Sequence, residues 1–183
     1  KAAEFIRTDN EDSALNVATV DEAITGAKDI VAERVSQDTK NRAAILDFYV
    51  KEGNIVTKGI VPEGQDEETA QKTSTYQMYW DYTEPLNQVK PHRILAINRA
   101  EREGALEVTI DVDVEGAIDL LKKRAVINNK YHAEAIEDGV IRLLSPAVIR
   151  EIRSNETDEA DAHGIGIFSE NLKNLLMTQP IKG

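Results

Sequence analysis

Residues 91–114 have the sequence PHRILAINRAEREGALEVTIDVDV, which combines a helix with a strand. Pro91 suits the first turn of a helix, where its missing N–H loses no hydrogen bond, and Gly104 is typical of a helix end. Apolar and polar residues then alternate over residues 105–114, and a period of two predicts a half-buried strand. The stretch therefore predicts a helix over about 91–103 followed by a strand.

A second strand is predicted nearby. Residues 54–61, NIVTKGIV, are rich in β-branched side chains, which favour strands. We expect residues 54–61 to pair antiparallel with residues 105–112, and this pairing would form a small β-element.

Most of the remaining chain has the period of amphipathic helices. The expected helices cover about 20–36, 39–51, 114–124, 130–143 and 145–177. Thr19 and Glu22 have the spacing of a capping box, Asp113 suits the N-cap of the helix that follows it, and Gly53 suits a helix end. The fold class is therefore mainly α: a multi-helix domain with a small antiparallel β-element and a long C-terminal helix.

The long C-terminal helix has its own features. Ser145 followed by Pro146 predicts a cap and a first-position proline at its start. Gly164 and Gly166 would weaken its middle by roughly 1 kcal/mol each relative to Ala. An apolar stripe is formed by Ile165, Phe168, Leu172, Leu175 and Leu176.

Composition limits the possible functions. The 183 residues carry a net charge of −11, and an acidic body repels phosphates, so nucleic acid would need a local basic patch. Membrane-surface binding is disfavoured for the same reason. The absence of cysteine excludes disulfides, a thiolate nucleophile and Cys-ligated zinc. No apolar run approaches the roughly 20 residues of a membrane span.

The chain is predicted to hold one domain. Residues 1–18 are polar and acidic and are expected to form a loose lead-in, whereas residues 19–183 form a helical scaffold domain. Residues 62–75 contain Pro62, Gly64 and many polar residues, and this composition predicts a mobile loop.

Basic residues concentrate on the helix over 91–103. His92, Arg99 and Arg102 fall on one side of it, and Arg93 is close in sequence. These four residues are the candidate nucleic-acid-binding residues, since clustered cations can contact phosphates. The other interpretation is that they form internal ion pairs with Glu101, Glu103 and the excess of acidic residues elsewhere.

Other clusters have an ordinary explanation beside a functional one. Asp111, Asp113 and Glu115 could bind a divalent cation, or they could form the solvated side of a strand that runs into a helix cap. Tyr76, Tyr79 and Trp80 could stack bases, although their spacing more often marks core packing. The basic run Lys122, Lys123 and Arg124 suits a helix C-terminus, where positive charges interact favourably with the helix macrodipole.

A reaction centre is not predicted. The histidines His92, His132 and His163 are too far apart in sequence for a local zinc motif. Neither a nucleophile motif nor a Gly-rich phosphate loop is present. We therefore expect no catalytic residues, no metal and no cofactor, and do not expect an enzyme.

Four segments resemble the bacterial Tex family of transcription accessory proteins. PHRILAINRAEREGAL at 91–106 resembles the family's P-x-H-R-x-L-A-x-N-R-G-E-x-E run, with Ala100 where Gly is common. EAITGAKDIVAERVSQD at 22–38, YWDYTEPL at 79–86 and FSENLKNLLMTQPIKG at 168–183 resemble further family segments in the expected order. Gly164 and Gly166 fall where the family commonly has Ala.

The resemblance implies a place in a long, multidomain cytoplasmic protein. The chain resembles the latter part of that protein's N-terminal helical region, ending before an RNase-H-like domain, and other domains hold most nucleic-acid contacts. It implies a non-catalytic scaffold whose parent binds RNA or DNA, with the transcription machinery as a candidate partner and with no membrane partner. The alternatives are an autonomous nucleic-acid-binding module using the basic helix at 90–102 and a metal-dependent hydrolase. The oligomeric state is left open.

Overall fold

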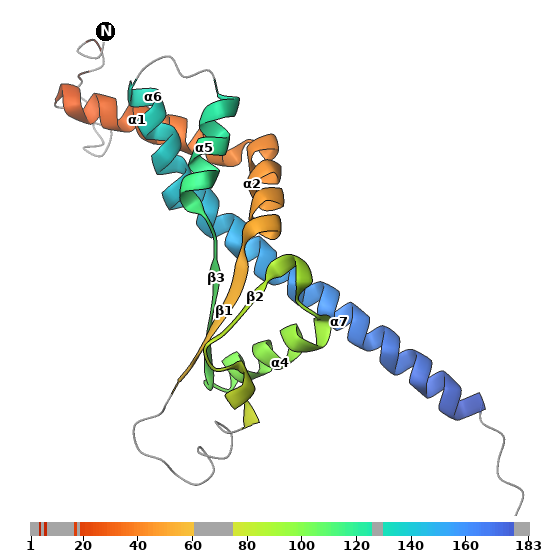
Figure 1. Cartoon of the computed structure of the whole chain (residues 1–183). Helices are drawn as coiled ribbons and strands as arrows, with labels where there is room; N and C mark the ends of the chain where they lie inside the picture. The colour runs from red at the N-terminus through yellow and green to blue at the C-terminus, as the bar shows by residue number, and fades with distance from the viewer. Residues whose placement is uncertain are drawn as a thin grey trace, which may run out of the picture. The chain divides into compact units, whose positions relative to one another are not determined.

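The computed structural model describes residues 4, 6, 17, 19–60, 75–125 and 130–177 (Figure 1). Most of the predicted lead-in at 1–18 and nearly all of the predicted loop at 62–75 lie outside the described residues. The chain divides into two compact units. We call residues 1–48 with 113–148 the helical unit, and residues 49–112 with 149–183 the sheet unit.

The helical unit consists of α1 (Val20–Gln37), the first part of α2 (Thr39–Glu52), α5 (Val114–Arg124), α6 (Lys130–Asp138) and the π-helical segment η5 (Gly139–Leu144). Two predicted caps are confirmed. The Thr19 hydroxyl accepts the N–H of Glu22 at 3.1 Å, and the Glu22 carboxylate accepts the N–H of Thr19 at 3.2 Å. Asp113 accepts the N–H of Gly116 at 2.8 Å and so caps α5.

The core of the helical unit lies where α1 packs against α6 and η5. A Cβ atom on Gly139 would lie 2.9 Å from the carbonyl oxygen of Ala32, so the two backbones approach closely here. The buried apolar side chains of the unit include Ala32, Ile45, Ile118, Leu121, Ile136, Val140 and Leu144. Their helical spacing matches the predicted amphipathic period.

The sheet unit contains an antiparallel sheet with strand order β2-β1-β3. The strands are β1 (Asn54–Gly59), β2 (Tyr82–Pro85) and β3 (Leu106–Asp111). Ile55 lies opposite Ile110 in β3 and opposite Glu84 in β2. The predicted pairing of 54–61 with 105–112 is confirmed, and β2 is an addition that the sequence did not predict.

Helix α4 (Pro91–Arg102) packs against β3 and ends in a Schellman motif. Gly104 has a φ of +72°, its N–H donates to Glu101 at 3.0 Å, and the N–H of Ala105 donates to Ala100 at 2.9 Å. The left-handed conformation is one that glycine adopts without strain, which explains the glycine at this helix end.

The aromatic group packs in the core of the sheet unit. Tyr76 is buried with Ala100, Ala105 and Leu106, and Tyr79, Trp80 and Val108 pack against this cluster. The Trp80 ring covers Gly59 so closely that a Cβ there would lie 2.4 Å from it. The short 3-10 helices η3 (Gln77–Tyr79) and η4 (Leu86–Gln88) flank β2.

Helix α7 (Ser145–Met177) continues directly from η5. The predicted cap at Ser145 is wrong, because Ser145 has helical angles of φ −59° and ψ −49° and so lies within a continuous helical path. Gly164 and Gly166 do not interrupt α7. None of the helices in the described ranges is both long and apolar enough to cross a membrane.

Candidate nucleic-acid interface on helix α4

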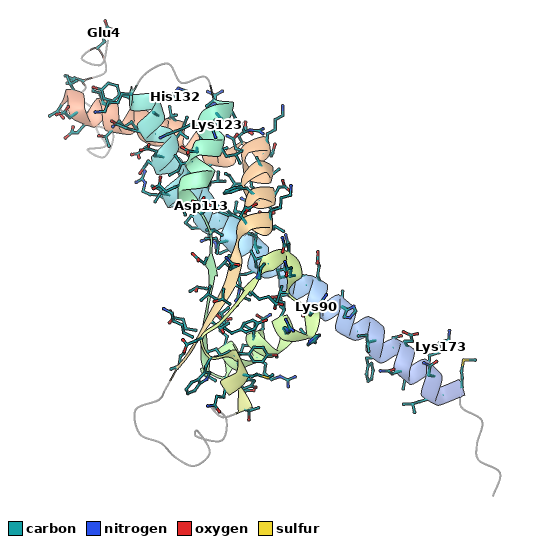
Figure 2. The ribbon with its side chains drawn as sticks, in the orientation of Figure 1. Glu4, Lys90, Asp113, Lys123, His132 and Lys173 are labelled. Atoms are coloured by element: carbon teal, nitrogen blue, oxygen red, sulfur yellow. The ribbon has the colours of Figure 1, made fainter. Side chains whose placement is uncertain are left out.

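The candidate basic residues lie on two different faces of α4. Because successive residues turn by about 100° around a helix, His92, Arg99 and Arg102 share one face, and all three are exposed. Arg93 lies on the side that carries the buried residues Ile94, Ile97 and Ala100. Figure 2 marks Lys90, which is the residue before α4 begins. The structure therefore brings three of the four candidates together and separates Arg93 from them.

Arg93 joins α4 to the edge strand β2. Its guanidinium forms an ion pair with Glu84 and donates to the Tyr82 hydroxyl at 3.2 Å. The Tyr82 hydroxyl in turn donates to Glu84. Burial alone would raise the pKa of Glu84, but the hydrogen bonds from Tyr82 and Arg93 outweigh burial and hold that pKa below its usual value. Arg93 is therefore engaged within the fold.

The other three candidates remain available to a partner. His92, Arg99 and Arg102 form no ion pair with another described residue, and Arg102 donates only a long hydrogen bond of 3.4 Å to the carbonyl of Asn98. Basic side chains such as Arg99 and Arg102 commonly contact phosphate oxygens. Among the residues that the structure describes in the sheet unit, this face is therefore a candidate surface for phosphate.

A polar pocket of about 450 Å³ borders the basic face between α4 and α7. On its α4 side lie Asn98 and Arg102, and Asn98 donates to the Thr157 hydroxyl at 2.9 Å. Asp158 and Asp161 line the α7 side. Their negative charge opposes a phosphate at the Arg102 end, so the His92–Arg99 end of the face is more favourable for an anion.

Arg153 forms another ion pair between elements of the sheet unit. It reaches from α7 to Glu101 on α4, and one of its guanidinium nitrogens is buried without a partner among the described residues. Glu101 and Arg153 are 52 positions apart. No local sequence pattern identifies a pair at that separation, and the sequence likewise did not indicate Glu84 as the partner of Arg93.

The carboxylates considered for a metal have other surroundings. Asp113 uses one carboxylate oxygen to cap α5, and Asp111 and Glu115 are exposed. Within the described ranges, no group of three His, Asp or Glu side chains is arranged to hold a metal ion.

The basic run at the end of α5 is divided between two environments. Lys122 forms an ion pair with Glu137 of α6. Lys123, labelled in Figure 2, and Arg124 are exposed in the last turn, where cations interact favourably with the helix macrodipole.

Comparison with known proteins places the chain in a family. Residues 1–168 match the family model described as Tex central region-like. The chain belongs to this family. The resemblance inferred from the four sequence segments is therefore confirmed.

Relatives are found in bacteria and in animals. The chain is 40% identical to the uncharacterized protein YdcI of Bacillus subtilis over 91% of this chain and 23% of that protein. It is 26% identical to the transcriptional accessory protein Tex of Neisseria gonorrhoeae over 90% of this chain and 22% of that protein. With the human S1 RNA-binding domain-containing protein 1 it shares 22% identity over 91% of this chain and 18% of that protein. The chain thus spans less than a quarter of the length of these relatives.

Proposed function

We propose that the chain is a non-catalytic support region of a longer Tex-family protein. In this proposal the chain braces and orients parts of the parent protein that bind nucleic acid. Two observations support the direction of the proposal. Relatives carry the names transcriptional accessory protein and S1 RNA-binding domain-containing protein, and the chain corresponds to less than a quarter of their length.

The observation that carries the proposal is the exposed apolar face of α7. Ile165, Phe168, Leu172, Leu175 and Leu176 lie on one side of this helix, and all are exposed. Phe168 is 67% exposed and Leu176 is 77% exposed. Covering such a side chain contributes roughly 1.5–3 kcal/mol, and an exposed contiguous apolar surface marks an interaction site. We propose that another part of the parent protein covers this face.

The charged contacts within each unit also suit a structural role. In the helical unit, Lys28 of α1 forms an ion pair with Glu134 of α6. Arg142 of η5 pairs with Asp29 of α1 at 2.7 Å. In the sheet unit, Arg153 and Glu101 connect α7 with α4. These pairs join separate helices and so fix their positions rather than converge on a substrate.

A second candidate function is an autonomous nucleic-acid-binding module. It is favoured by one face of α4 that carries the exposed side chains of His92, Arg99 and Arg102, none of which forms an ion pair with another described residue. Its binding would depend strongly on salt, because counterions are released when cations meet phosphates.

Titration separates the two functions. The chain alone and the full-length parent would each be titrated with single-stranded and double-stranded RNA and DNA at two salt concentrations. The support role predicts binding by the parent and no micromolar binding by the chain alone. Salt-sensitive micromolar binding by the chain alone, lost in the double variant Arg99→Ala and Arg102→Ala, would replace the support role by the module.

A variant of the parent tests the apolar face. The double substitution Phe168→Ser and Leu172→Ser should weaken RNA binding by the parent, although the support role gives neither residue a contact with RNA. Ile167→Ser is the matched control, because Ile167 is also exposed but points away from the stripe on α7. Equal RNA affinity in the double variant and the control would contradict the proposal.

The non-catalytic part of the proposal has its own test. A metal-dependent hydrolase that used Asp111, Asp113 and Glu115 would retain a divalent cation. Elemental analysis of the purified protein should find no stoichiometric cation. If a stoichiometric cation were found in the protein and were absent from the Asp111→Asn variant, the metal-dependent hydrolase would be favoured instead.

A further inference from the structure

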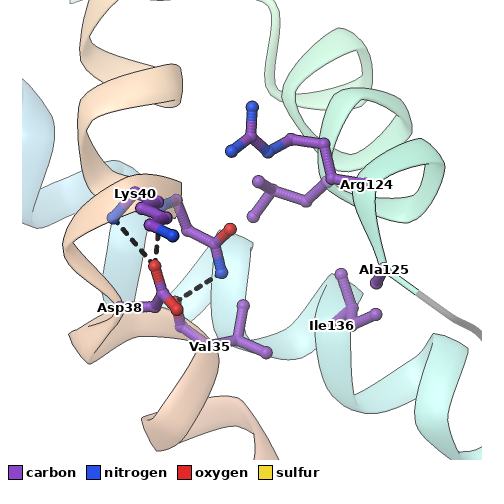
Figure 3. Close-up of a pocket in the computed structure, with 8 residues that line it drawn as sticks. Val35, Asp38, Lys40, Arg124, Ala125 and Ile136 are labelled. Atoms are coloured by element: carbon purple, nitrogen blue, oxygen red, sulfur yellow. Dashed lines mark hydrogen bonds between the residues drawn. The ribbon is translucent and has the colours of Figure 1, made fainter.

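A pocket of about 360 Å³ opens in the helical unit (Figure 3). Its apolar side is formed by Val35 of α1, by Leu121 and Ala125 at the end of α5, and by Ile136 of α6. Leu121 and Ile136 are almost fully buried, with 2% and 1% exposed. The accessible apolar surface of the pocket therefore comes mainly from the half-buried Val35 and Ala125, with Leu121 and Ile136 as closely packed aliphatic neighbours in the lining.

The rim of the pocket is cationic. Lys40 of α2 and Arg124 of α5 line it from opposite sides, as Figure 3 shows, and both are exposed. Neither side chain forms an ion pair with another described residue. In a chain with a net charge of −11, two unpaired cations at one opening form a local positive site.

The remaining polar groups of the pocket are already engaged. One carboxylate oxygen of Asp38 accepts the N–H groups of Lys40 at 2.8 Å and Asn41 at 3.1 Å, and thereby caps α2. The Asn41 amide donates to the carbonyl of Val35 at 3.2 Å. Asp38 is thus partly neutralised by the start of α2, which leaves Lys40 and Arg124 as the groups that select a ligand.

We propose that this pocket binds an acidic peptide segment, with one aliphatic side chain against the apolar base and carboxylates at Lys40 and Arg124. The base is aliphatic and contains no aromatic ring, so it suits a leucine-like side chain better than a nucleobase, which stacks on aromatic rings. Two cations can neutralise one or two carboxylates of a peptide. The many phosphates of a nucleic acid would instead be repelled by the net negative charge of the chain. The pocket is independent of the α4 face and of the support role.

The test uses three short peptides with blocked ends and NMR spectra of the isotope-labelled chain. The probe is Glu-Leu-Asp-Glu, the uncharged control is Gln-Leu-Asn-Gln, and the control without an apolar group is Glu-Ser-Asp-Glu. The probe should give saturable shifts at Val35, Ala125 and Ile136, and each control should bind at least about fivefold more weakly. Equal shifts with the probe and the uncharged control would overturn the proposal.

Protein variants locate the site. The double variant Lys40→Gln and Arg124→Gln should bind the probe about fivefold or more weakly, because two exposed charge contacts are lost. Lys123→Gln is the matched control, since Lys123 is exposed in the same turn of α5 but does not line the pocket. An unchanged affinity in the double variant would overturn the proposal. The proposal would also be overturned if single-stranded oligouridine shifted the NMR signals of the same residues more strongly than the probe does.

Discussion

Two glycines of the helical unit give opposite predictions for the same substitution. A Cβ atom on Gly139 would lie 2.9 Å from the carbonyl oxygen and 3.0 Å from the Cα of Ala32. A Cβ atom on Gly26 in α1 would meet nothing within 4 Å. Both glycines are in helical segments, where Ala is favoured over Gly by up to about 1 kcal/mol. Gly26→Ala should therefore stabilise the helical unit.

Gly139→Ala should destabilise the same unit. Its methyl group meets backbone atoms of α1, which cannot rotate aside as a side chain can, so α1 must shift away from η5. Overpacking of this kind costs about 1–3 kcal/mol, which exceeds the gain in helix propensity. A change of about 1 kcal/mol shifts the Tm of a chain of this size by roughly 2–4 °C, in opposite directions for the two variants.

Thermal and urea unfolding followed by circular dichroism measure both effects. NMR amide signals of α1 and α6 would assign the change to the helical unit. The double variant Gly26→Ala and Gly139→Ala should show the sum of the two changes in unfolding free energy. A Cβ atom on Gly26 meets no atom within 4 Å, so the two sites share no contact. If Gly139→Ala were as stabilising as Gly26→Ala, the close packing of α1 against η5 would be refuted.

Three further predictions concern a helix cap, a turn and one half-buried carboxylate. Thr19→Ala should lower the unfolding free energy in urea by about 1 kcal/mol, because the capping box of α1 is lost, and Thr19→Ser should retain most of it. Gly104→Ala should lower the unfolding free energy by about 1–2 kcal/mol in the same assay, because Gly104 has a φ of +72°. A change smaller than the one caused by Gly26→Ala would contradict the Schellman motif. Burial, and to a smaller extent the charge of Glu159, raise the pKa of Glu156 above its usual value. Ionised Glu156 therefore destabilises the fold at neutral pH. This destabilisation disappears as the pH falls below the usual pKa of about 4.5. Glu156→Gln should therefore raise the unfolding free energy at pH 7 but not at pH 4, and a gain of equal size at both values would refute the assignment.

Local signals in the sequence predicted much of the fold. The capping box at Thr19, the cap at Asp113 and the glycine at 104 act over a few residues, and the structure places each where the pattern indicated. Alternation over 105–114 identified β3 because one face of the strand is buried and the other exposed. Ser145 was misassigned because a Ser-Pro pair fits the interior of a helix that arrives from η5 as well as a helix start.

The remainder depends on contacts that are distant in the sequence. β2 has only four residues and ends at Pro85, which is tolerated because β2 is an edge strand. No period can be recognised in so short a segment. The separation of Arg93 from the other basic residues depends on Glu84, which only the sheet brings within reach. Likewise, the period of α7 predicted an apolar stripe but not whether another part of the chain covers it.

In the proposed support role, the apolar face of α7 is the surface on which the rest of the parent protein packs. Hydrogen–deuterium exchange of residues 165–177 can be compared between this chain alone and the full-length parent. Exchange should be rapid in the chain alone and slower by about tenfold or more in the parent, because packing stabilises the last turns of the helix. Equal exchange in both proteins would show that nothing covers this face, and the support role would then be wrong.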